Sequence, residues 1–333
     1  MKISGSIYSD KKRTLKETVL DLKAHQVDLL HVDCNDDVSV FKDIENIRTW
    51  CDLPIDLHII TETPEKFFDY LRKHPVEYVT FQYEDLTAPL TIPADIKGEK
   101  GLGIITPTAI TAFDEYPDFD FILMMATIPG QSGGVFDPDN FRKIRQFKQK
   151  YPNKNVHVDG GVNGEVSFIL RNMGVHSSVS GSFLFKGPSI GQALMDLTKR
   201  KIESRFKIKD FMIPQEECPI IDFQSATFKT VIKLIDSGKL GFIVVEESGH
   251  FMGIISNADL RKGLIKHIDN MDELTIKEIV NQTPITIDSE ANVDDMLHLV
   301  REQSFPVMYL PVINAQNKAV GIITFVNLIK GEL

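Results

Sequence analysis

The chain has 333 residues, of which 42% are hydrophobic and 25% charged, a length that favours two domains because single cores rarely grow beyond about 250–300 residues. Its net charge of −10 argues against binding to nucleic acid or to an anionic membrane surface, since both require a surplus of lysine and arginine. No apolar run is long enough to span a membrane and residues 1–12 are too polar for a signal peptide, so we expect a cytoplasmic protein.

Short apolar, β-branched runs alternate with longer segments of helical period over residues 2–185, which is the pattern of repeated βα units. This pattern predicts eight parallel strands in a closed (β/α)₈ barrel, or TIM barrel. An open sheet is the alternative, but it would carry phosphate-binding glycines after its first strand, and none are there. The predicted strands are residues 2–8, 28–34, 54–60, 78–84, 101–106, 121–127, 155–160 and 177–182.

A densely basic stretch, residues 199–210, has no core-facing apolar stripe and predicts the domain boundary. We therefore assign the barrel to residues 1–200, a linker to residues 201–209 and a second module to residues 210–333.

The second module contains a weak internal repeat. The segment GIISNADLRK of the first copy corresponds to GIITFVNLIK of the second, with Gly253 and Gly321 at equivalent positions. The copies cover about residues 210–268 and 272–333, and each predicts a strand, a helix, two strands and a helix. The module should therefore be α+β.

Two imidazoles and two carboxylates lie near the ends of three predicted strands. Side chains two residues apart in a strand share a face, so His31 and Asp33 project together. His58 and Asp159 lie near the ends of the third and seventh strands, and all these ends meet at the face of a barrel that holds active sites. Taken singly, each residue is more often hydrogen-bonded to a loop than functional. Together they predict a site for one divalent metal ion.

Six motifs follow the predicted strands in order: SIYS, HVD, DLHII, MMATIPG, VDGGVN and GSFLF. In this order they resemble the ribulose-phosphate 3-epimerase family over residues 2–186. The resemblance implies that His31, Asp33, His58 and Asp159 bind zinc, iron or manganese, between which these ligands do not discriminate. It also implies that Asp33 and Asp159 are the catalytic acid and base. They would remove and return the proton beside a ketone, while the metal stabilises the enediolate as a Lewis acid.

Backbone N–H groups after the seventh and eighth strands are candidates for holding the phosphate of a ketose phosphate without a lysine. The alternative is that these glycines only form tight turns. The resemblance also places one serine of the first strand close to the substrate. The candidate substrate-binding residues are Ser6, Gly130, Gly133, Gly160, Gly161, Gly181 and Ser182.

Three departures from the family pattern concern the surroundings of the substrate. Asn35 and Ile60 stand where the family has methionines, and residues 129–134 read PGQSGG in place of PGFGGQ. We therefore expect 3-epimerisation of a ketose phosphate related to ribulose 5-phosphate. One alternative is a metabolite-binding scaffold that has lost turnover. Decarboxylase or aldolase chemistry would need a lysine at a strand end, and none of the predicted ends supplies one.

The repeat of the second module resembles a tandem cystathionine β-synthase (CBS) pair, or Bateman module, and such pairs often bind adenosine nucleotides. Ser256 and Asp259 match positions that contact phosphate and ribose, and Thr324 is the counterpart of Ser256 in the second copy. Asn327 replaces the second aspartate, so the resemblance implies one intact site for an adenosine nucleotide or nucleotide sugar. The alternative is that the pair only packs into dimers. We expect a homo-oligomer.

Overall fold

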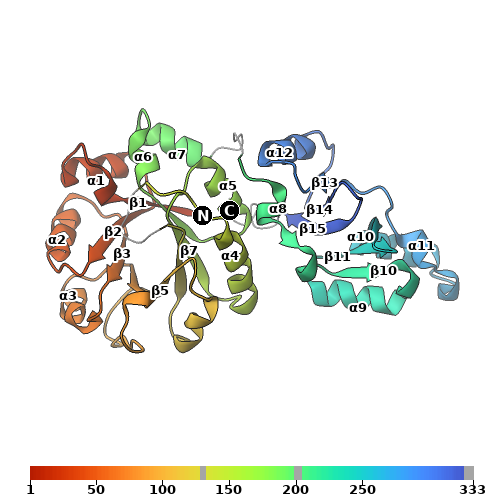
Figure 1. Cartoon of the computed structure of the whole chain (residues 1–333), viewed down its shortest axis with the longest axis horizontal. Coiled ribbons are helices and arrows are strands. Elements are labelled where there is room, and N and C mark those ends of the chain that lie inside the picture. The colour runs from red at the N-terminus through yellow and green to blue at the C-terminus, as the bar shows by residue number, and fades with distance from the viewer. Residues whose placement is uncertain (128–132, 199–204, 326–333) are drawn as a thin grey trace. The chain divides into compact units, whose positions relative to one another are not determined.

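The computed structural model describes residues 1–127, 133–198 and 205–325. These residues fall into two compact units, 1–198 and 205–325, coloured red to green and teal to blue in Figure 1. No helix in the described ranges is long and apolar enough to cross a lipid bilayer.

The first unit is a closed barrel in which each parallel strand pairs with the next along the chain and β8 pairs with β1 (Figure 1). The predicted (β/α)₈ barrel is therefore confirmed. Its strands are β1 Lys2–Ser6, β2 Leu29–Asn35, β3 Ile55–Ile60, β4 Tyr78–Gln82, β5 Glu99–Ile105, β6 Phe121–Met125, β7 Asn155–Asp159 and β8 Ser177–Ser180. Its helices are α1 Leu15–Ala24, α2 Val40–Trp50, α3 Phe68–Lys73, α4 Asp139–Lys150, α5 Gly164–Asn172, α6 Ser182–Lys186 and α7 Ile190–Thr198.

Several predicted strands are longer at their carboxyl ends than the observed strands. Ile7–Ser9 and Tyr83–Asp85 are 3₁₀ turns (η1 and η3), and α6 begins at Ser182. The reason is that the chain must leave the barrel wall to reach the next helix, and its backbone then bonds locally instead of across the sheet. The 3₁₀ segments η2 Pro64–Phe67 and η4 Ile110–Glu115 lie in two further connections.

An apolar layer fills part of the barrel interior. Its buried members come from strands spaced around the barrel and include Leu29, Tyr78, Phe121 and Leu123. His157, which shares a strand face with Asp159, stacks on Phe121 with 4.1 Å between ring centroids. Burial lowers the pKa of His157 to about 3, so this imidazole is a neutral core residue at physiological pH.

The second unit consists of two sheets, ordered β10-β11-β12 and β13-β14-β15-β9. The first copy has the predicted order of strand, helix, two strands and helix. The second copy follows the same order as far as it is described, and its predicted last helix falls on residues 326–333, outside the described residues. The strands are β9 Ile213–Pro214, β10 Ile220–Asp222, β11 Phe242–Glu247, β12 His250–Ser256, β13 Ile287–Asp288, β14 Tyr309–Ile313 and β15 Ala319–Thr324. The helices are α8 Ile208–Phe211, α9 Phe228–Gly238, α10 Asn257–Lys266, α11 Ile276–Ile279 and α12 Val293–Arg301, with short 3₁₀ turns η5 Gln215–Glu217, η6 Phe223–Ser225 and η7 Met271–Glu273.

The two repeated glycines allow the copies to exchange backbone segments. Ile213 in β9 precedes the first copy's strand β10 but pairs with β15 of the second copy, and its carbonyl oxygen would overlap a Cβ built on Gly321. Asn281 precedes the second copy's first strand, and its backbone N–H and carbonyl both hydrogen-bond with the backbone of Ile254. The carbonyl oxygen of Asn281 would overlap a Cβ on Gly253. Glycine at both positions thus lets each copy's leading segment add to the other copy's sheet.

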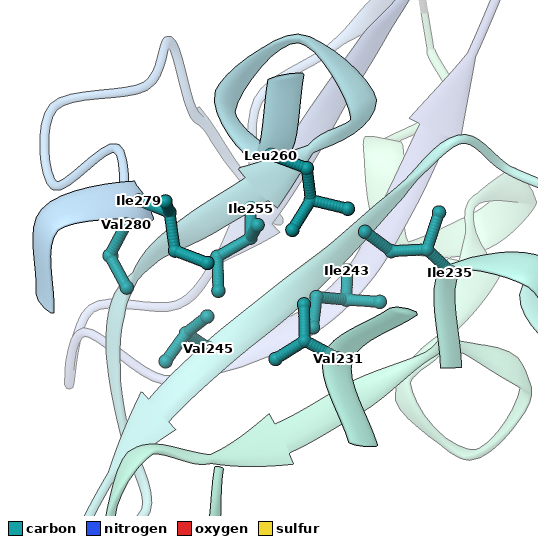
Figure 2. Close-up of a cluster of buried hydrophobic side chains, with 8 residues drawn as sticks. All are labelled: Val231, Ile235, Ile243, Val245, Ile255, Leu260, Ile279 and Val280. Atoms are coloured by element: carbon teal, nitrogen blue, oxygen red, sulfur yellow. The ribbon is translucent and has the colours of Figure 1, made fainter. Parts of the chain in front are cut away.

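A core of apolar side chains joins the first copy to the leading segment of the second. Thr227 caps α9, and Val231 and Ile235 lie one helical turn apart on its buried face. Figure 2 shows these two side chains pointing toward those of β11, β12, α10 and α11. The buried members of this cluster are Val231, Ile235, Ile243, Val245, Ile255, Leu260, Ile279 and Val280.

Candidate active site

Four polar side chains converge at the carboxyl ends of three barrel strands. His31 and Asp33 lie on the inward face of β2, and the pairing register places Asp33 of β2 beside His58 of β3. His31 Nε2 lies 3.2 Å from Asp33 Oδ1 and 3.7 Å from Asp159 Oδ2, whereas His58 Nδ1 lies 3.8 Å from Asp33 Oδ1. One potential ligand atom from each of the four lies within 4.8 Å of the others.

The remaining nitrogen of each imidazole already has a partner. His31 Nδ1 lies 2.9 Å from Asp56 Oδ2, and His58 Nε2 lies 2.8 Å from Gln82 Oε1. Both rings are fully buried, and His58 Nδ1 has no hydrogen-bond partner among the described residues. Two imidazole nitrogens therefore face two carboxylates with their outer nitrogens satisfied, a donor set that fits one divalent cation.

The two aspartates have opposite pKa shifts. Burial opposes ionisation of Asp33, but the imidazoles of His31 and His58 outweigh burial and hold the pKa of this carboxyl far below its usual range. Burial raises the pKa of Asp159 to about 6, and the Asp33 carboxylate adds to the rise. Burial also opposes charge on His31, but Asp56 and Asp33 raise the pKa of this imidazole well above its usual value. Carboxyl pairs whose pKa values are pushed apart are a feature of acid–base sites.

A cavity of about 650 Å³ lies against the two aspartates. Asn35 and Thr127 are among its polar lining residues. Gly130 lies outside the described residues, so its position is not assigned. The other predicted substrate-binding residues all line the cavity: Ser6, Gly133, Gly160, Gly161, Gly181 and Ser182.

The two glycines after β7 are required by close backbone contacts. Gly160 has φ +107° and Gly161 has φ +66°, in the region that favours glycine. A Cβ on Gly161 would overlap the backbone nitrogen of Phe136, and one on Gly160 would overlap the side chain of Thr127. The geometry therefore supports the tight-turn interpretation, and because both glycines also line the cavity it remains compatible with a phosphate site.

Sequence reasoning missed several residues around the site. Asp56 is two residues before His58 in β3, so the alternation of side chains could have placed it on the same inward face. Lys11 and Lys186 line the cavity, although the sequence argument required no lysine. Lys186 Nζ lies 3.5 Å from the point where a Cβ would stand on Gly133. No sequence pattern distinguishes these lysines from surface cations.

The predicted nucleotide-binding residues lie in one region of the second unit. Ser256 caps α10 and exchanges capping hydrogen bonds with Asp259, whose carboxylate accepts from the Ser256 backbone N–H at 2.9 Å. Phe242 pairs with Ser256 across one sheet, and Tyr309 pairs with Thr324 across the other. The two rings stack with 3.8 Å between their centroids. Ser256 and Thr324 are thus each the strand partner of one of the two stacked aromatic residues, a pair that sequence reasoning missed.

Each of the two units matches the model of a known protein family. Residues 2–185 match the model of the ribulose-phosphate 3 epimerase family, and residues 276–332 match that of the CBS domain, which confirms both resemblances. The ribulose-phosphate 3-epimerase of Candida glabrata is 30% identical over 161 residues, a match that covers 47% of this chain and 65% of that protein. The ribulose-phosphate 3-epimerase of Methanocaldococcus jannaschii is 28% identical over 227 residues, covering 64% of this chain and 95% of that protein. The solved structure of CBSX2 in complex with AMP is 23% identical with a TM-score of 0.33, covering 38% of this chain and 96% of that chain.

Proposed function

We propose a function for this chain from one premise: it belongs to the ribulose-phosphate 3-epimerase family, a family of isomerases. The barrel inverts the carbon beside the carbonyl of a ketose phosphate. The observation that supports this proposal is the convergence of His31, Asp33, His58 and Asp159. The two aspartates line a cavity large enough for a small sugar phosphate.

Proton transfer in this proposal uses the two cavity-facing carboxylates. Inversion needs a base on one face of the substrate and an acid on the other, and the reverse reaction exchanges the roles. Asp33 from β2 and Asp159 from β7 come from different strands and both line the cavity. The carboxyl group that is ionised when the substrate binds would remove the proton, and the other would supply one from the opposite face.

His31, Asp33, His58 and Asp159 would together hold one divalent cation, which is zinc, iron or manganese by ligand type. When bound, such an ion acts as a Lewis acid toward the negative charge that develops on the substrate oxygens. The imidazoles of His31 and His58 would position the two aspartates. Because both rings are buried, they also limit the access of water to the site.

Around the sugar, we assign Ser6 to orienting the substrate and the glycine loops to its phosphate. Gly160, Gly161, Gly181 and Ser182 would offer backbone or hydroxyl donors, so that an acidic chain can still bind an anion. Gly133 belongs to the same wall. Gly130 lies outside the described residues and stays a predicted substrate-binding residue on family resemblance alone.

A substrate panel tests the reaction and its specificity. The panel consists of pentulose and hexulose phosphates, and the measured quantity is kcat/KM for epimerisation. We expect kcat/KM for a relative of ribulose 5-phosphate to exceed that for ribulose 5-phosphate itself about 10-fold or more, because Asn35 changes the polarity of the cavity wall. Asn35→Met, which restores the family residue, should move the preference toward ribulose 5-phosphate. A wild-type preference for ribulose 5-phosphate would contradict the specificity and leave the reaction class standing.

For the second unit, we propose regulation or assembly through an adenosine nucleotide or nucleotide sugar. Ser256 and Asp259 would contact its phosphate and ribose, and Thr324 would serve in the second copy. The position of these residues beside the stacked rings of Phe242 and Tyr309 supports the proposal. Cytoplasmic location and self-association stay predictions.

Thermal unfolding with adenosine nucleotides and nucleotide sugars tests this binding. A ligand at about 100 times its Kd should stabilise the second unit by about 2.7 kcal/mol. Ser256→Ala should abolish the shift, whereas Thr227→Ala, which removes the capping hydroxyl of α9, should keep it. Both variants lower the baseline by about 1 kcal/mol, so each shift is measured against its own ligand-free transition. The absence of a shift with every ligand would favour a purely structural module.

A further inference from the structure

A chain of hydrogen bonds runs from His58 away from the proposed metal site. His58 Nε2 lies 2.8 Å from Gln82 Oε1, at the end of β4, and Gln82 Nε2 donates to Glu84 Oε2 in η3. The other oxygen of Glu84 accepts from the backbone N–H of Ile105 at 3.1 Å and from the hydroxyl of Thr108. Glu84 is thereby tied to the end of β5 and the loop that follows it.

The chemistry of these groups gives the chain one direction. An ionised carboxylate only accepts hydrogen bonds, so Glu84 must face the NH₂ group of the Gln82 amide. The amide oxygen of Gln82 then faces His58 and can only accept, which puts the ring proton of neutral His58 on Nε2. The lone pair of the imidazole is left on Nδ1, the atom that faces Asp33.

The opposite orientation of the amide would place the wrong nitrogen at the metal site. With its NH₂ group toward His58, Gln82 would require Nε2 as an acceptor and would move the proton to Nδ1. Such a ring cannot ligate a cation through Nδ1 without first losing that proton. Glu84 therefore discriminates between a competent and an incompetent tautomer.

Space for the central bond depends on Gly103 in β5. A Cβ on Gly103 would lie 2.8 Å from Gln82 Oε1 and 3.3 Å from His58 Nε2, so any larger residue would push the two groups apart. His58 and Gln82 are both buried, where water does not compete for the bond. His31 needs no such relay, because the carboxylate of Asp56 contacts its Nδ1 directly.

We propose that Glu84, acting through Gln82, fixes the tautomer of His58 and so prepares its Nδ1 as a metal ligand. Both are positioning residues that touch neither substrate nor metal. The inference rests on the proposed metal site, and it adds that the affinity of this site for metal is set in part by an exposed glutamate outside the cavity lining.

Zinc affinity of the full chain, stripped of metal and titrated in competition with a chromophoric chelator, tests the relay. Glu84→Gln lets the neighbouring amide flip and should weaken Zn²⁺ binding about 10-fold, and Gln82→Leu should weaken it about 10–100-fold. Glu65→Gln, an exposed glutamate in η2, should leave it unchanged. Because Glu84 acts through Gln82, the double variant should bind no more weakly than Gln82→Leu alone.

The ring ¹⁵N shifts of His58 provide a second measurement that does not need metal. Metal-free wild-type protein at about pH 8 should show the tautomer protonated at Nε2, and Glu84→Gln should mix the two tautomers. Unchanged zinc affinity and tautomer in Glu84→Gln would overturn the relay, as would a full additive loss in the double variant. A wild type that shows the Nε2 tautomer yet binds no zinc would refute the metal site while supporting the relay.

Discussion

Replacing Asp159 with asparagine should lower epimerisation by about 10²–10⁴-fold, because an amide can neither take nor return the proton that a carboxyl group transfers. Exchange of solvent deuterium into the carbon beside the ketone should fall by the same factor, since it reports on proton removal itself. Asp33→Asn should have an effect of similar size if the second carboxylate serves the opposite face.

Asp52→Asn is the matched control. Asp52 has a side chain that is 90% exposed and pairs with Lys23, and the same chemical change there should leave turnover intact. Metal content is measured for each variant, because loss of a ligand would lower activity by a different route. A barrel that binds sugar phosphates but shows no exchange even in the wild type would support the alternative of a scaffold without turnover.

The second large effect is expected at Gly161. An alanine there must adopt φ +66°, which costs about 1–3 kcal/mol, and its Cβ overlaps the Phe136 backbone, which adds about 1–3 kcal/mol of overpacking. Denaturant unfolding should record the lower stability, and KM for the ketose phosphate should rise because the loop at the proposed phosphate site must shift.

Gly249→Ala separates strain from contact. Gly249 has φ +75°, and no atom of the described residues lies within 4 Å of the position of a Cβ, so alanine there costs only the backbone conformation, about 1–2 kcal/mol. KM should not change in this variant. Equal loss of stability in the two variants would show that the contact with Phe136 is unimportant, and an unchanged KM in Gly161→Ala would argue against the phosphate assignment.

The fold was predictable because its signals are local. Each barrel strand is a short apolar run, and the predicted strands overlap all eight observed strands from β1 to β8. Their ends were less predictable: Ile7 is buried and β-favouring, yet it lies in a 3₁₀ turn where the chain leaves the barrel wall. In the second unit the repeat was visible, but the exchange of β9 into the other copy's sheet was not.

The site was predictable only in part, and for a related reason. The two-residue spacing of His31 and Asp33 determines that they share a face whatever the rest of the chain does. Gln82 and Glu84 have the same spacing, but their sequence context does not show that they belong to His58, because their partner lies on a neighbouring strand. Contacts between side chains of different strands depend on the pairing register of the barrel, and the sequence of one strand does not specify that register.

By itself, the sequence determined the (β/α)₈ barrel, the repeated second module, the family and the four converging polar side chains, because each follows from periodicity or motif order within short segments. Only the tertiary structure decided which nitrogen of each imidazole faces Asp33, which lysines reach the cavity, and why Gly161, Gly253 and Gly321 must lack a side chain. These properties depend on distances between segments far apart in the chain, and such distances exist only once the barrel has closed and the two copies have paired.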